Sequence, residues 1–145
     1  MNDQILNNEF DIDIFESYRD ANKLQVLLFS IYSYLRFVFT KKGYDIYHIH
    51  MASKGSIFRK SLYVRKIKKW NKKVIVHIHG SNFMDFYNGL SMNMKQYIKS
   101  ILQLSDCVIA LSDQLKETFD QTFDLNNCVS IVNGIDTDTY KECIC

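Results

Sequence analysis

Two short apolar segments that each end in the pattern His-x-His constrain this chain more than any other feature of its sequence. The later one, Lys73 to Gly80, carries Val74, Ile75 and Val76 in succession instead of alternating them with polar residues. Such a run is typical of a parallel strand with helices on both faces. We therefore expect a central strand that delivers His79 to its carboxyl end, where parallel α/β sheets bind ligands.

The earlier segment, Tyr44 to His50, has the same ending and is followed by a loop of small residues. Because side chains alternate across a strand, His48 and His50 share one face, and so do His77 and His79. The second histidine of each pair stands at the strand end. For His48 and His77, which lie inside their strands, we expect neutral core imidazoles with hydrogen-bond partners.

Helical and strand patterns alternate along the rest of the chain. This alternation predicts an α/β fold with a doubly wound, mostly parallel, Rossmann-like sheet. The four strands that begin near Tyr44, Val74, Cys107 and Val129 should lie side by side in that order. We expect helices over 1–8, 22–42, 57–70 and 91–104 and after Ser112, strands over 11–18, 44–50, 73–79, 106–112 and 128–132, and an aromatic loop over 83–90.

The 145 residues suffice for one domain, and the absence of proline argues against an internal linker. Within the segment 22–42, the apolar run 23–40 is shorter than the ~20 apolar residues of a membrane span, and it carries Gln25 and Arg36. We interpret it as a buried helix, with membrane contact as the alternative. Four cysteines without metal-finger spacing and no recognisable signal peptide favour a reduced, cytoplasmic setting.

Basic residues are concentrated in one stretch, because no acidic residue lies between Asp45 and Asp85. This charge suits an anionic partner such as a phospholipid surface, a nucleotide or a phosphorylated substrate. A solvated helix face is the alternative. Without a nucleic-acid-binding motif, we expect no nucleic-acid partner. The basic residues of the stretch are Lys54, Arg59, Lys60, Arg65, Lys66, Lys68, Lys69, Lys72 and Lys73.

Histidines at two strand ends could ligate zinc or another divalent ion. A hydrolytic metal site would also need a carboxylate at another strand end, where Ser112 and Asn133 stand instead. We therefore expect no metal ligands and no metal cofactor. The chain also lacks a Walker sequence, a G-x-G-x-x-G loop and a G-x-S-x-G elbow.

Four segments, in their order and spacing, resemble the amino-terminal domain of glycosyltransferase family 4 enzymes with the GT-B fold. The likeness covers nearly the whole chain, and the last segment is similar to the family's junction between domains. The segments are Tyr44-Asp-Ile-Tyr-His-Ile-His50, Val74-Ile-Val-His-Ile-His-Gly80, Ser105-Asp-Cys-Val-Ile-Ala-Leu-Ser112 and Val129-Ser-Ile-Val-Asn-Gly-Ile-Asp136.

The resemblance implies that this domain holds the sugar acceptor and that a carboxy-terminal domain holds the nucleotide sugar. Transfer then occurs in the cleft between the two domains without a bound metal. The family's strand-end histidine, which lies near the transferred sugar, corresponds to His79 as the catalytic residue. The implied substrate-binding residues are His50, Ser53, Lys54, Gly55, Ser56, Arg59, Lys60, Gly80, Ser81, Asn133, Gly134 and Asp136.

Compared with the family, the sequence lacks the first strand with its glycine-rich loop and the donor domain. We interpret residues 1–136 as an acceptor-binding domain truncated at its start and residues 137–145 as the start of the interdomain junction. Alone it should be inactive and marginally stable, with 12–18 as its least secure strand. The parent would be a cytoplasmic hexosyltransferase, peripheral on the inner membrane face, with a lipid-linked or polysaccharide acceptor. The alternative is a stand-alone binding or anchoring subunit that docks a separate donor-binding chain.

Overall fold

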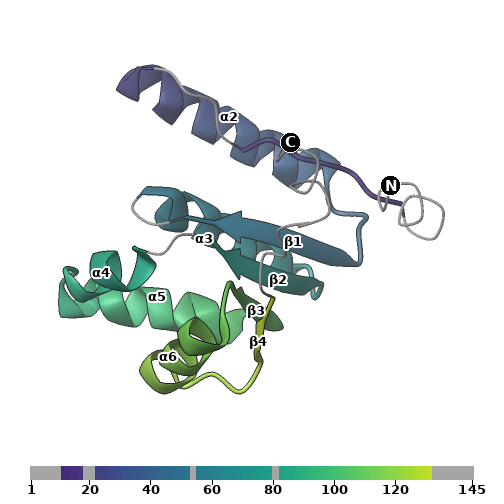
Figure 1. Ribbon diagram of the computed structural model, residues 1–145. Helices are drawn as coiled ribbons and strands as arrows, with labels where there is room; N and C mark the ends of the chain where they lie inside the picture. The colour runs from purple at the N-terminus through teal and green to yellow at the C-terminus, as the bar shows by residue number, and fades with distance from the viewer. Residues whose placement is uncertain (1–10, 18–21, 53–54, 80–81, 132–145) are drawn as a thin grey trace, which may run out of the picture. The chain divides into compact units, whose positions relative to one another are not determined.

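The computed structural model describes residues 11–17, 22–52, 55–79 and 82–131, and Figure 1 traces the remainder in grey. The chain divides into two compact units, Met1–Lys41 and Lys42–Cys145, which we describe one at a time. The helix expected over residues 1–8 lies outside the described residues.

The first unit contains one long helix, α2 (Lys23–Thr40), in agreement with the prediction. Asn22 precedes it in an extended conformation, and its backbone amide donates to the Gln25 side chain over 3.4 Å. The helix is not buried within its own unit as the sequence predicted, since several apolar side chains along it are exposed, among them Leu24, Leu28 and Phe39. Of the helices in the described part of the chain, none is both long and apolar enough to cross a membrane.

The strand expected from residue 11 onward is not formed, since residues 11–17 adopt neither helix nor strand. Instead, this segment packs within its own unit. Phe15 contacts Phe37 of α2 with ring centroids 5.6 Å apart, and Asp13 forms an ion pair with Lys41. The alternating Ile12 and Ile14 are both exposed.

The second unit is built on a parallel sheet of four strands in the order β1-β2-β3-β4. Both the order and the parallel direction confirm the prediction, and the strand that contains Val74 is central. The strands are β1 (Ile46–Met51), β2 (Lys73–Ile78), β3 (Cys107–Ala110) and β4 (Cys128–Ser130).

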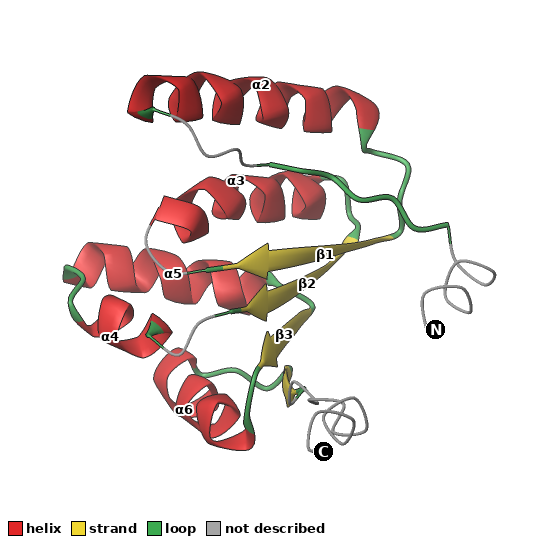
Figure 2. Ribbon diagram, turned by 45° about the horizontal axis from the view of Figure 1, so that its top comes forward, coloured by secondary structure: helices red, strands yellow, loops and turns green. Residues whose placement is uncertain are grey.

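Helices α3 (Gly55–Lys69), α5 (Met92–Leu104) and α6 (Asp113–Phe123) connect successive strands. Helix α3 contacts α5, and α5 contacts α6, so the three form one layer (Figure 2). Right-handed crossovers between strands that follow the chain order place every connecting helix on the same face. Fully buried Met51, Val76 and Ile78 alternate toward that layer. The histidines of β1 and β2 therefore occupy the opposite face.

Residues 83–88 form a short helix, α4 (Phe83–Asn88), where an aromatic loop was expected. The cause is packing of aromatic rings four residues apart, which fall on one helix face. Phe83 lies 5.4 Å from Phe119 between ring centroids, and Tyr87 lies 4.8 Å from Phe123. Sequence periodicity over six residues is too short to reveal this arrangement.

The apolar spacing of Phe58, Leu62, Tyr63, Ile67 and Trp70 predicts which face of α3 is buried, and the observed buried face is rotated from it. Tyr63 and Ile67 are buried as expected, but Leu62 is 48% exposed and Ser61 is fully buried. The Ser61 hydroxyl contacts the Tyr97 hydroxyl at 2.6 Å and donates to the carbonyl oxygen of Phe58 over 2.7 Å. Because its hydroxyl is satisfied by these hydrogen bonds, the serine can occupy a core position.

Asp106 joins α3 to the start of β2 and β3. Its carboxylate accepts hydrogen bonds from the Lys68 Nζ at 2.8 Å, the Val74 backbone amide at 2.8 Å and the Lys73 Nζ at 3.1 Å. Burial acts to raise the pKa of the Asp106 carboxyl, but these three donors outweigh it and lower the pKa to about 2.

The ionised Asp106 should therefore stabilise the fold above pH 4 and lose its contribution as the pH falls toward 2, because its folded pKa lies below the unfolded value. We expect Asp106→Asn to lower the free energy of unfolding by about 2 kcal/mol at pH 7. Urea denaturation between pH 7 and pH 3 would measure this, and Asp45→Asn, at an exposed carboxylate paired with Lys72, is the matched control. If the difference in the free energy of unfolding between Asp106→Asn and wild type does not shrink below pH 4, the stabilising role of the ionised Asp106 is contradicted.

Candidate functional site

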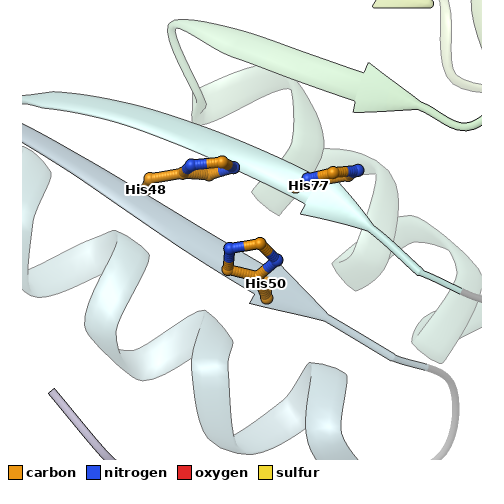
Figure 3. Close-up of side chains that lie close together, drawn as sticks. All are labelled: His48, His50 and His77. Carbon is orange, nitrogen blue, oxygen red and sulfur yellow. The ribbon is translucent and has the colours of Figure 1, made fainter. Parts of the chain in front are cut away.

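The carboxyl ends of β1 and β2 bring all four histidines of the chain together. The parallel register pairs His50 with His77, and the backbone amide of His79 donates to the carbonyl oxygen of Met51 over 2.7 Å. Because the register puts the two His-x-His segments side by side, their imidazoles form one group on the face away from the helices. Figure 3 shows three of them, His48, His50 and His77.

His50 and His79, both expected at the site, are in direct contact. The Nδ1 of His50 lies 2.5 Å from the Nε2 of His79, and the rings stack with centroids 4.7 Å apart. One of the two nitrogens must be protonated and the other not, so the contact is a hydrogen bond between imidazoles. Burial first, and then the neighbouring His48, His79 and Lys60, lower the pKa of His50.

His77 is a core imidazole, as predicted, but it lacks the expected hydrogen-bond partner. Its side chain is 8% exposed, and neither ring nitrogen has a hydrogen-bond partner within the described residues. Burial, followed by the charges of His79, His50 and His48, lowers the pKa of His77 to about 4, so its ring is neutral at pH 7.

His48 departs further from the expectation of a core histidine. It is exposed, because β1 is the edge strand of the described sheet and none of the connecting helices covers this face. Its ring stacks on that of His50, with centroids 4.5 Å apart. Partial burial of its imidazole, followed by the charge of His79, lowers the pKa of His48 as well.

The start of α3 lies beside these strand ends. The Nζ of Lys60 donates a hydrogen bond to the carbonyl oxygen of His50. The guanidinium of Arg59 lies back against Gly55 in the first turn, 3.6 Å from the position that a Cβ on this glycine would take. Ser56 lies inside that turn, and its Oγ accepts from the Ala52 amide over 3.4 Å.

The structure thus gathers six of the predicted site residues around the ends of β1 and β2. They are His50, Gly55, Ser56, Arg59, Lys60 and His79. The other predicted residues, Ser53, Lys54, Gly80, Ser81, Asn133, Gly134 and Asp136, lie outside the described residues.

Sequence reasoning assigned His48 and His77 to the core and missed that they adjoin the site. A usable signal was present, because equal spacing in two neighbouring parallel strands allows both pairs to face the same side. In the structure, ligand nitrogens of His48, His50 and His77 all lie within 4.8 Å of one another.

Domains with a parallel α/β sheet bind their ligands at the carboxyl ends of the strands, where the polar side chains are gathered here. The chain belongs to Glycosyltransferase Family 4, since the model of this family matches residues 7–139. The match confirms the family that the four sequence segments resemble, and this is therefore a glycosyltransferase domain. The comparison with curated proteins finds no significant match.

Proposed function

We propose that this domain binds the acceptor of a hexosyltransferase that moves a sugar from a nucleotide sugar to a lipid-linked or polysaccharide acceptor. The observation that carries the proposal is the contact between His50 and His79 at the adjoining ends of β1 and β2. Parallel sheets of this kind bind their ligands at that edge. The family match supports sugar transfer as the reaction.

His79 has the chemistry to act on a sugar. A neutral imidazole has one donor and one acceptor nitrogen. The contact with His50 engages the Nε2 of His79 and leaves its Nδ1 to reach a sugar hydroxyl. The side chain is half-buried at the strand end, where a ligand can approach it. In this proposal, His79 is the catalytic residue and His50 orients its ring.

The first turn of α3 supports an acceptor that carries a phosphate group. This turn has no acidic residue, and it brings the side chains of Arg59 and Lys60 to the same strand end. Backbone amides at a helix start and basic side chains both favour an anion. A lipid-linked sugar carries such a phosphate next to its acceptor sugar.

The nucleotide sugar is assigned to a separate carboxy-terminal donor domain, so this domain should not catalyse transfer by itself. We expect no metal ion to take part in transfer, as the family resemblance implies. The test is an assay of the domain joined to a donor domain, with a panel of nucleotide sugars and with phosphate-linked and phosphate-free acceptors. Nucleotide release that depends on a phosphate-linked acceptor is expected. Absence of release with every donor sugar would contradict the proposal.

The basic face of α3 suits an anionic membrane surface that carries the acceptor. Three lysines of the basic stretch are paired with two carboxylates, because Lys68 and Lys73 share Asp106 and Lys72 pairs with Asp45. Arg65 lies 5.0 Å from the Tyr97 ring centroid but remains exposed, as does Lys69. The positive charge available to a membrane is therefore smaller than the sequence count suggests.

We expect the protein to co-sediment with vesicles that contain anionic phospholipid and to be released as salt rises. Each basic residue near such a surface contributes about 1 kcal/mol, screened over about 10 Å at moderate salt. Reversing two charges, in Arg65→Glu/Lys69→Glu, should lower binding at least tenfold. Equal binding to neutral and anionic vesicles would show instead that α3 presents a solvated face.

A further inference from the structure

Three imidazoles on adjoining strands have the arrangement of a metal-ligand set. His48 and His50 lie two residues apart on one face of β1, and His77 of β2 pairs with His50 in the register. The ring centroids of His48 and His77 are 5.5 Å apart, and those of His50 and His77 are 5.2 Å apart. Figure 3 shows the three rings gathered on one side of the two strands.

His77 is the member that points most directly to a ligand. Its side chain is more than nine-tenths buried, yet both ring nitrogens lack a hydrogen-bond partner in the described part of the chain. Buried polar atoms are normally satisfied, because an unsatisfied one costs free energy. An ion bound by one ring nitrogen each of His48, His50 and His77 would satisfy one of the two unpartnered nitrogens of His77.

The contact between His50 and His79 supplies the outer partner that metal-bound histidines usually have. A ligating imidazole commonly donates its second N–H to a neighbouring acceptor, which sets its tautomer and orientation. His50 can donate through Nδ1 to the Nε2 of His79, 2.5 Å away. In that tautomer, the Nε2 of His50 is unprotonated and available to an ion.

We propose that His48, His50 and His77 bind one divalent transition-metal ion such as Zn²⁺, with His79 as the outer partner of His50. Imidazole nitrogen is a preferred ligand of zinc, cobalt, nickel and copper ions. Three histidine ligands leave one tetrahedral position for water or another small ligand. The site does not depend on the assignment of sugar transfer, because its evidence is the placement of these four side chains.

The three imidazoles must move slightly closer together to bind an ion. The ligand nitrogens lie within 4.8 Å of one another, whereas a tetrahedral zinc ion at a Zn–N distance of about 2.0–2.1 Å separates them by ~3.4 Å. Rotation of the exposed His48 and His50 side chains can close this difference. No carboxylate belongs to this histidine set, and Lys60 donates to the carbonyl of His50. We therefore expect micromolar affinity, weaker than that of sites with anionic ligands.

The ion would occupy the same ends of β1 and β2 at which we propose that the acceptor binds. His50 would serve both the ion and the orientation of His79, so an ion and an acceptor would compete for this edge of the sheet. The transition metal would then be an inhibitor of sugar transfer and not its cofactor.

The test is titration of the purified chain with Co²⁺ alone and then with Zn²⁺ in competition, at pH 7.5. Cys143 and Cys145 lie outside the described residues, so the titration is done in a Cys143→Ser/Cys145→Ser background to remove their thiols. We expect one ion per chain and a visible cobalt spectrum of nitrogen and oxygen ligands.

Single variants then identify the ligands. His48→Ala and His50→Ala, at exposed positions where the fold should persist, are each expected to lower Co²⁺ affinity at least 100-fold. His79→Ala should lower it about tenfold, as loss of an outer partner does. His77→Gln, with circular dichroism to verify folding, tests the buried ligand. The proposal is overturned if no stoichiometric binding occurs, or if both His48→Ala and His50→Ala bind the ion as wild type does.

Discussion

Replacement of His79 by alanine in the complete enzyme is expected to reduce kcat/KM for sugar transfer at least 100-fold while the domain remains folded. A positioned side chain that exchanges a proton or hydrogen bond with a reacting group contributes typically 10²–10⁴-fold. His79 leaves the sheet at the edge where we propose that the acceptor binds, and its backbone amide, which bonds to Met51, is retained in alanine. Fold retention is therefore expected, in contrast with the buried His77.

The comparison between His79→Ala and His79→Asn makes this test specific. Asparagine restores one donor and one acceptor, so it should recover part of the lost activity if hydrogen bonding to the sugar is the role of His79. Thermal unfolding of both variants checks that the fold persists. Turnover at the wild-type level in His79→Ala would remove this residue from the site. If instead the variant unfolds at a lower temperature and loses activity for that reason, the role of His79 is structural.

Replacement of Leu102 by alanine is expected to lower the free energy of unfolding by about 2–5 kcal/mol, because it removes buried methyl groups and leaves a cavity. Leu102 is fully buried on α5, in the layer between α3 and α6. The loss would be a large share of the ~5–15 kcal/mol by which a domain is stable. Urea denaturation can be followed by the fluorescence of Trp70, the single tryptophan of the chain, which lies beside Tyr47 of β1.

Leu62→Ala provides the matched control, since the same side-chain atoms are removed from a position that is 48% exposed. We expect a loss below about 1 kcal/mol there, as for most substitutions away from the core. The pair also tests the orientation of α3, because the sequence pattern predicted that Leu62 faces inward. Similar losses in both variants would show that the helix is rotated toward the predicted face.

Much of the sheet could be predicted from the sequence, because its strands are apolar and separated by regular helical segments. The run Val74-Ile75-Val76 identified the central strand. The helix predicted after Ser112 is α6, which the Ser112 hydroxyl caps by accepting from the Leu115 amide over 3.2 Å. Parallel direction and strand order followed from the alternation of strands with helices and the handedness of their crossovers. The positions of His50 and His79 at strand ends could also be predicted from the local sequence pattern.

Other features depended on contacts between segments distant in the sequence. Residues 11–17 alternate like a strand, but Phe15 packs on Phe37 of α2 and the segment forms no strand. Residues 83–88 form α4 because Phe83 and Tyr87 pack against rings of α6, 36 residues further on in each case. Local pattern cannot report either contact, since each is decided by which partner the fold brings near.

The four histidines show most clearly which features the sequence determined and which the tertiary structure decided. The sequence by itself determined that each strand presents two imidazoles on one face, because side chains alternate along any strand. Only the tertiary structure decided that the two pairs face the same side and that His50 lies opposite His77 and within 2.5 Å of His79. Register is the physical reason, since a shift of one residue between β1 and β2 would have turned one pair of imidazoles to the opposite face.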